Sequence, residues 1–229
     1  MGKIALIAGA TGLVGRELVR LLLSDPYYDK VKVVARKSTE IKDNRLEEII
    51  IEFDELEAHA KDLSATHYYV TLGTTMRKAK TKDNFYKVDF TYPHILAKMA
   101  KKDQGFEKYL IVTAYGASTD SSIYYNRVKG EIEEAIKVLE LKSLHIFQPS
   151  LLLGFRPEFR IFEELSKLIM PILVFLTFGQ IKIRAIEGLT VAKAMLKVGK
   201  HSHDGTHVYP NNIIEEISLS SLPTEEIEE

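Results

Sequence analysis

Apolar residues follow two alternating patterns along the first two-thirds of the chain. Short, nearly continuous apolar runs, typical of buried strands, occupy residues 3–9, 31–36, 46–53, 66–73, 108–116 and 144–154. Apolar residues return at helical spacing in residues 13–25, 84–103 and 122–141. Pro93 predicts a kink or a late start in the second of these helices. Buried strands joined by helices predict an α/β protein with a doubly wound parallel sheet.

The pattern changes in the last third of the chain. Helices are expected near residues 158–169 and 187–199, and a short strand at 206–210. The apolar stretch Leu168–Phe178 is interrupted by Pro171 and is shorter than the roughly 20 residues of a membrane span. We therefore expect no span, but burial in the core or at a subunit interface, with contact to a membrane surface as the alternative.

The composition sets limits on function. The chain has 229 residues, 45% of them hydrophobic, so it can bury a sizeable core. The formal net charge is −1 and no basic stripe stands out, so nucleic-acid binding is not expected. The lack of cysteine excludes disulfides, thiol nucleophiles and thiolate metal sites. It also fits a reducing compartment, and because no signal peptide is visible we expect a cytoplasmic protein.

A glycine-rich turn joins the first predicted strand to the first helix. In GATGLVG, residues 9–15, Gly9 permits a tight turn and Gly12 lets the backbone approach a pyrophosphate at the helix N-terminus. Gly15 lets the helix pack closely on the strand. A merely structural turn is the alternative, but the strand before and the helix after favour a Rossmann-type dinucleotide site. We expect one domain, 1–229, with a dinucleotide-binding core at 1–154 and a small substrate-covering region at 155–229.

The end of the second predicted strand indicates which dinucleotide binds. A carboxylate there would bond the ribose hydroxyls of NAD, but this chain has Arg36 and Lys37. A guanidinium can hold a 2′-phosphate through two hydrogen bonds. The sequence therefore favours NADP(H) over NAD(H), with an ordinary solvated loop as the alternative.

Two Y-x-x-x-K patterns occur, and chance alone can produce this motif. Tyr28 and Lys32 lie where the second strand begins, away from any predicted helix, and are dismissed. Tyr125 and Lys129 lie on one face of the helix after the fifth strand, near the carboxyl edge of the sheet. In carbonyl reduction a tyrosine can protonate the alkoxide, because a nearby ammonium stabilises the phenolate. The same lysine can hold the nicotinamide ribose.

Helical spacing separates the two adjacent tyrosines. Tyr124 lies five residues before Lys129 and points elsewhere on the helix, so Tyr125 is the expected proton donor. Thr113, at the end of the fifth strand, is the candidate for polarising the carbonyl, and Ser118 is a looser one.

These motifs together resemble the short-chain dehydrogenase/reductase superfamily. The segments LGTT, YKVDF, YNRVKGEIE, QPSLLLGFRPEFR and GTHVY are similar to its atypical branch, which includes the mammalian Tat-interacting oxidoreductase-like protein and small bacterial relatives. The resemblance implies that cofactor contacts come from Thr11, Gly12, Leu13, Val14, Arg36, Lys37, Leu72, Gly73, Lys129 and Leu151. It also implies that Leu151 to Arg156 lie past the nicotinamide and that Arg160 faces substrate or phosphate.

The chain departs from the superfamily pattern in three places. Thr113 replaces a serine, Ala114 follows where a second serine often stands, and Gln148 replaces an arginine before a proline. These departures weaken the expectation of turnover more than that of cofactor binding.

Other polar groups are assigned no chemistry. His201, His203 and His207 are close in sequence, but the Asp204-Gly205 turn indicates a loop, and no metal site is expected. The adjacent carboxylates Glu133–Glu134 and Glu163–Glu164 are expected on solvated helix faces. The basic run at residues 76–82 is interpreted as a solvated loop, with a flap over an anionic ligand as the alternative.

The main hypothesis is an NADPH-dependent oxidoreductase that reduces a small carbonyl substrate. The alternative is an NADP(H)-sensing protein that regulates a partner through the same site. An epimerase or dehydratase with tightly held NAD is disfavoured by Arg36 and by the short C-terminal region. A homodimer or a regulatory protein partner is compatible with the apolar stretch.

Overall fold

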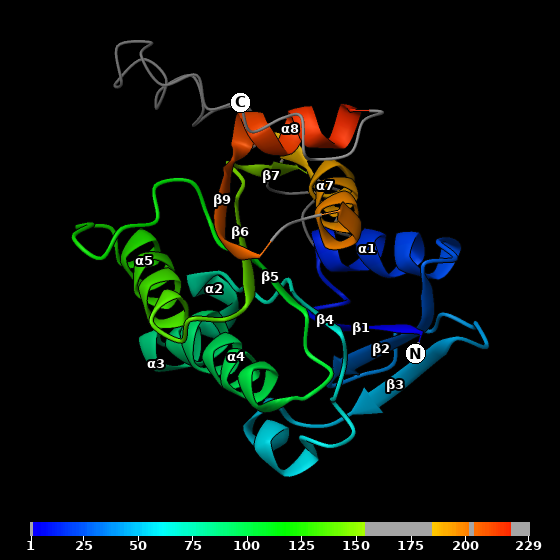
Figure 1. Ribbon diagram of the computed structural model, residues 1–229. Coiled ribbons are helices and arrows are strands. Elements are labelled where there is room, and N and C mark those ends of the chain that lie inside the picture. The colour runs from blue at the N-terminus through cyan, green and yellow to red at the C-terminus, as the bar shows by residue number, and fades with distance from the viewer. Residues whose placement is uncertain (1, 154–184, 202–203, 221–229) are drawn as a thin grey trace.

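A computed structural model describes residues 2–153, 185–201 and 204–220 (Figure 1). Within these residues, seven strands form a central sheet in the order β3-β2-β1-β4-β5-β6-β9. They are β1 (Lys3–Ala8), β2 (Tyr28–Ala35), β3 (Leu46–Ile50), β4 (His67–Val70), β5 (Lys108–Val112), β6 (Ser143–Gln148) and β9 (Gly205–Pro210). All neighbouring strands pair in parallel, so the predicted parallel α/β sheet is confirmed.

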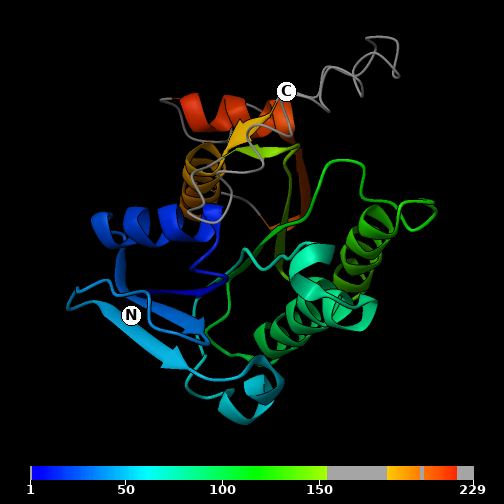
Figure 2. The same ribbon diagram turned by 180° about the vertical axis from the view of Figure 1, so that it is seen from behind.

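Helices cover both faces of this sheet (Figures 1 and 2). One layer consists of α1 (Leu13–Ser24), α7 (Gly188–His201) and α8 (Asn211–Leu219). The other contains η1 (Phe53–His59), α2 (Met76–Ala79), α3 (Lys82–Tyr86), η2 (Lys87–Thr91), α4 (Tyr92–Lys102) and α5 (Tyr124–Lys137). Alternate residues of β1 serve the two layers: Ala5 and Ile7 join the core under α1 and α7, whereas Leu6 and Ala8 join the core under α4 and α5.

The helix predicted over residues 84–103 is divided into three parts. It begins as α3, passes through the π-helical segment η2 and continues as α4, with Pro93 in the first turn of α4. The N–H of Tyr92 still bonds to the carbonyl of Lys87 in η2, whereas proline has no N–H to continue this hydrogen-bond pattern. The predicted late start at Pro93 therefore corresponds to the change from η2 to α4. The short helices η1 and α2, and helix α8, were not predicted.

The C-terminal part of the chain contributes to the central sheet itself. Strand β9 pairs with β6, from Ser143↔Gly205 to Gln148↔Pro210, so the sheet extends beyond residues 1–154. A small second sheet pairs β7 (Leu152–Leu153) with β8 (Ile186–Glu187). The helix expected near 158–169 and the apolar stretch 168–178 lie outside the described residues. In the described part of the chain, no helix has the length and apolar character to cross a membrane.

Candidate functional site

The glycine turn between β1 and α1 has the geometry of an anion-binding loop. Gly9 has a positive φ of 97°, and its carbonyl accepts the N–H of Gly12 at 2.9 Å. A Cβ on Gly15 would lie 2.2 Å from the Gly9 oxygen, so only glycine allows this approach. At Gly12, α1 begins without a side-chain cap and without an acidic residue in its first turn. Its first N–H groups are therefore suited to an anion.

A cavity of about 1060 Å³ runs from this turn across the carboxyl ends of β1, β2 and β4. Its volume is slightly above the roughly 300–1,000 Å³ usual for small-molecule sites. Its walls include the glycine turn, the first residues after β2 and β4, the start of η1, parts of α2 and η2, and the start of α7. The expected cofactor residues that line it are Gly9, Thr11, Gly12, Leu13, Arg36, Leu72 and Gly73.

Five expected cofactor residues do not line this cavity. Val14 and Gly15 are buried in the first turn of α1, and Lys37 is exposed outside the cavity. Leu151 is also exposed, and Leu153 lines the wall instead. Lys129 is buried just behind the wall at Gly73. Arg156 and Arg160 lie outside the described residues.

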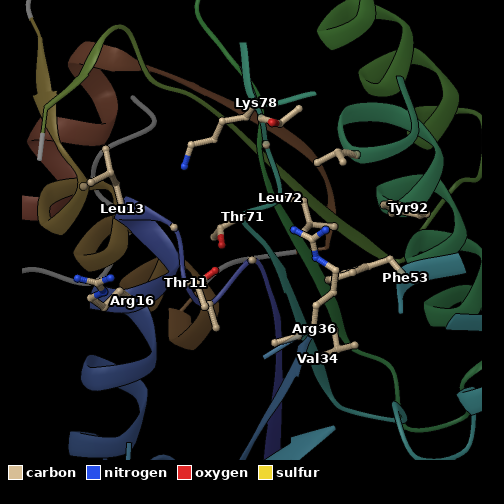
Figure 3. A pocket seen from close by; sticks show the side chains of 18 of the residues that line it. Thr11, Leu13, Arg16, Val34, Arg36, Phe53, Thr71, Leu72, Lys78 and Tyr92 are labelled. Atoms are coloured by element: carbon tan, nitrogen blue, oxygen red, sulfur yellow. The ribbon is translucent and has the colours of Figure 1, made fainter. Parts of the chain in front are cut away.

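Arg36 lies at one end of the cavity, beside two aromatic rings. Its side chain points from the end of β2 toward Leu72 (Figure 3). The rings of Phe53 and Tyr92 lie 5.4 Å apart and form an adjoining wall. Burial and the Asp54 carboxylate raise the pKa of Tyr92 to about 12, whereas the nearby Arg36 guanidinium lowers it. This end of the cavity thus combines a flat apolar wall with a cation.

Lys78 enters the cavity from α2, on the side opposite Arg36. Its ammonium group points toward the part of the wall that contains Leu13 and Thr11 (Figure 3). Thr75 is the N-cap residue of α2, and its hydroxyl oxygen accepts the N–H of Lys78 at 3.3 Å. The interpretation of residues 76–82 as a loop is wrong, because this run forms α2 and the start of α3, but its residues other than Ala79 are exposed as expected.

The cavity wall at Gly73 adjoins a buried ion pair. The Nζ atom of Lys129 lies 2.7 Å from Oδ1 of Asp89, and the two side chains are 5% and 0% exposed. A Cβ added to Gly73 would be 3.6 Å from that Asp89 oxygen and 3.8 Å from the Lys129 nitrogen. Asp89 was missed in the sequence, although it lies four residues after the buried Phe85, on the apolar side of the helix.

Tyr125 and Tyr124 both contact Phe85 but differ in their other partners. Tyr125 is 38% exposed, and its ring meets Phe85 edge-on at 5.8 Å. Its phenolic group is near enough to Lys129 to contribute to raising the pKa of that ammonium. Tyr124 packs against the cluster of Phe85 and Val128 as well, but its hydroxyl donates to the carbonyl of Lys82.

Thr113 is engaged in a buried cluster rather than open to a substrate. Its hydroxyl donates to Glu133 at 2.5 Å, and Gln148 donates its amide N–H groups to the same carboxylate. A hydroxyl has a single proton, so Thr113 is not a free donor here. The expectation that Glu133 lies on a solvated face is wrong, because it is 4% exposed, whereas Glu134 is exposed. Ser118 is exposed in the loop before α5.

The histidines near the C-terminus form no metal cluster among the described residues, which omit His203. His207 stacks on His145 at 5.2 Å between ring centroids. The two ring nitrogens of His145 form hydrogen bonds with the hydroxyls of Ser143 and Tyr209 within the sheet.

Comparison with known proteins identifies the family. Residues 5–136 match the NAD-dependent epimerase/dehydratase family. The chain belongs to this family. It is therefore a member of an NAD(P)-binding oxidoreductase family, and the expected resemblance to short-chain dehydrogenases/reductases is confirmed.

Three relatives illustrate the similarity. "Protein FMP52-1, mitochondrial" of Scheffersomyces stipitis is 35% identical over 157 residues, 66% of this chain and 68% of that protein. "Protein fmp52-1, mitochondrial" of Aspergillus terreus is 30% identical over 211 residues, 90% of either chain. Protein HTATIP2 of Rattus norvegicus is 31% identical over 169 residues, 72% of this chain and 69% of that protein. The fungal names contradict the expected cytoplasmic location, because these relatives are named as mitochondrial proteins.

Solved structures confirm the Rossmann-type fold. MoeE5 in complex with UDP-glucuronic acid and NAD superposes with a TM-score of 0.69 at 17% identity, covering 90% of this chain and 75% of that one. The Bordetella bronchiseptica enzyme WbmH in complex with NAD⁺ gives 0.70 at 15% identity, covering 92% and 75%.

Proposed function

We propose that this protein is an NADPH-dependent oxidoreductase that reduces a small carbonyl compound. The observation that carries the proposal is the continuity of the cavity. It contains the glycine turn and Arg36, and its wall at Gly73 adjoins Lys129. Tyr125 precedes Lys129 by one helical turn on α5. A dinucleotide bound along this cavity would extend toward a proton donor.

The residues present fit such a dinucleotide. The uncapped start of α1 and Gly12 would hold the pyrophosphate, with Lys78 above it. Gly73 would lie under the ribose next to Lys129. Arg36, the first residue after β2, supports NADP(H) over NAD(H), because a guanidinium can bind a 2′-phosphate. Glu52 also lines this end of the cavity, so the preference depends on Arg36 facing the phosphate.

The chemistry then requires few groups. When bound, the reduced nicotinamide supplies a hydride to the carbonyl carbon. Tyr125 donates its phenolic proton to the oxygen that becomes an alcohol, and Lys129 stabilises the resulting phenolate. Because the Thr113 proton is directed to Glu133, we assign Thr113 to holding α5 against β5 and β6, and leave polarisation of the carbonyl to Tyr125.

Replacing Tyr125 with phenylalanine tests this function. We expect Tyr125→Phe to reduce NADPH-linked turnover of small aldehydes and ketones by about a hundredfold or more. Its affinity for NADPH should remain nearly unchanged, since the phenyl ring keeps its contact with Phe85. Tyr124→Phe is the matched control and should keep its turnover. Equal turnover in wild type and Tyr125→Phe would exclude the proton-donor role.

A second candidate is an NADP(H)-responsive binding protein without significant turnover. The hydrogen bond from Thr113 to Glu133 favours this candidate, because Thr113, the residue expected to polarise the carbonyl, already donates its proton to Glu133. In that protein Tyr125 and Lys129 would only hold the ribose. Capture of a partner protein that requires bound NADPH, together with no turnover of any carbonyl compound tested, would favour this candidate.

A further inference from the structure

The Lys129–Asp89 ion pair joins three separate elements. Lys129 comes from the middle of α5, and Asp89 comes from the π-helical segment η2. The second oxygen of Asp89 accepts the backbone N–H of Thr74 at 2.9 Å, in the loop after β4. π-Helical turns are rare and often mark functional sites. Here η2 brings a carboxylate to the wall of the cavity at Gly73.

Burial alone would deprive Lys129 of its charge. A fully buried lysine tends to release its proton, because an ammonium is poorly solvated there. Burial accordingly lowers the pKa of Lys129, but the charge of Asp89, aided by Tyr125 and Glu133, more than reverses this and raises it. Asp89 faces Lys129 from η2, and Tyr125 and Glu133 face it from α5, while the β4 loop contributes only the backbone N–H of Thr74 to Asp89.

We propose that Asp89 is a positioning residue that holds Lys129 in its charged form beside Gly73 before the cofactor binds. The proposal rests on the proposed function, in which Lys129 serves the ribose and Tyr125. Stabilising the phenolate requires an ammonium, since a neutral amine has no charge to offset it, and a charged donor also holds the ribose more strongly. An ammonium carries three N–H donors, so with one facing Asp89 two remain for the ribose and the phenol.

Protein without any ligand provides the first test. NMR spectra of protein with isotope-labelled lysine report the protonation of each side chain, and Lys129→Arg assigns the Lys129 signal by its disappearance. We expect Lys129 of the wild type to stay protonated to a higher pH than surface lysines do. In Asp89→Asn the pKa of Lys129 should fall. A wild-type Lys129 that loses its proton before the surface lysines, or an unchanged titration in Asp89→Asn, would overturn the proposal.

The affinity for NADPH provides the second test. In Asp89→Asn we expect affinity to fall as the pH rises through the lowered pKa of Lys129, by up to about tenfold per pH unit. Wild type should show no such fall in the same range. A purely structural role would weaken binding by one constant factor at every pH, and that result would contradict us. Asp25→Asn is the control, because Asp25 pairs with Lys200 at 2.8 Å away from the cavity.

The two proposals can fail separately. If NADPH does not bind at all, the proposed function fails, while the ligand-free titration still decides the role of Asp89. If Asp89→Asn does not fold, Asp89→Glu retains a carboxylate and should keep Lys129 charged. Early loss of the Lys129 proton in Asp89→Glu, together with early loss in wild type, would exclude the positioning role.

Discussion

Arg36 and Lys37 are adjacent in sequence, yet the structure gives them different positions. Arg36 lines the cavity beside Tyr92, and Lys37 is exposed outside it. Of these two adjacent cations, only Arg36 is therefore a candidate for contact with a 2′-phosphate. The proposed preference for NADP(H) therefore rests on this single side chain.

Arg36→Ala should weaken NADPH binding by about tenfold or more, because hydrogen bonds to charged groups contribute roughly 1.5–3 kcal/mol. Affinity for NADH should change little, since NADH has no 2′-phosphate. Titration calorimetry with both dinucleotides measures the difference. Lys37→Ala is the control and should bind both nearly as wild type does. An equal loss for NADH in Arg36→Ala would contradict the assignment.

At the scale of elements, helix α5 is held against the sheet by a polar cluster and a glycine. Glu133 of α5 accepts hydrogen bonds from Thr113 after β5 and from Gln148 at the end of β6. A Cβ on Gly130 would lie 2.3 Å from the backbone of Ser118, so this glycine lets the preceding loop cross α5 closely. These contacts fix the helix that carries Tyr125 and Lys129.

Glu133 should make stability depend on pH. Burial raises the pKa of Glu133 and outweighs the hydrogen bonds from Thr113 and Gln148, which lower it. A raised pKa in the folded state means that the stabilisation is complete below the ordinary value of 4.5 and is lost as pH rises through the raised pKa. Glu133→Gln removes this loss, so its stability relative to wild type should increase from acidic to neutral pH.

Denaturant unfolding at several pH values measures this effect. In Glu133→Gln the side-chain amide of Gln148 would have to flip, so that its oxygen accepts an N–H of the introduced amide. Glu134→Gln is the control, because Glu134 is exposed and pairs with Lys137 on the helix surface. It should change the free energy of unfolding by less than about 0.5 kcal/mol at every pH. The same pH dependence in Glu133→Gln and wild type would refute this account.

At the scale of the whole molecule, distant parts of the chain share the cavity. Leu13 is the first residue of α1, while Gly188 is the first residue of α7, near the other end of the sequence. A Cβ on Gly188 would lie 2.7 Å from the carbonyl oxygen of Leu13, so the two helices start in close contact. Beyond this contact, α1 and α7 contribute buried residues to the same hydrophobic core cluster. A ligand that fills this cavity would therefore contact both parts at once.

NADPH should accordingly stabilise the whole domain in one transition. At a concentration of a hundred times its dissociation constant, the gain is about 2.7 kcal/mol, seen as a higher Tm. Lys78→Met should reduce this rise for NADPH and NADH alike, because both contain the pyrophosphate that Lys78 is proposed to contact. Lys80→Met is the control, because Lys80 does not line the cavity. Equal losses in the two variants would argue against a specific contact at Lys78.

Much of this architecture follows from local sequence patterns. Continuous apolar runs identified six strands, and helical spacing identified α1, α5 and α7, because burial of one face imposes a period on each segment. The turn at Gly9, Gly12 and Gly15 could be predicted because only glycine meets its steric demands. Short helices without a long periodic pattern, such as η1 and α2, carried no comparable signal.

By itself, the sequence determined the fold class and the glycine turn, since each depends on spacing within one element, and the same kind of spacing led to the proposal of Tyr125 rather than Tyr124. Only the tertiary structure decided the surroundings of buried charges. Glu133 resembled a solvated carboxylate, and Asp89 was assigned no role, yet both are buried against partners from other elements. Their roles depend on contacts between residues far apart in the chain, and no local pattern records those contacts.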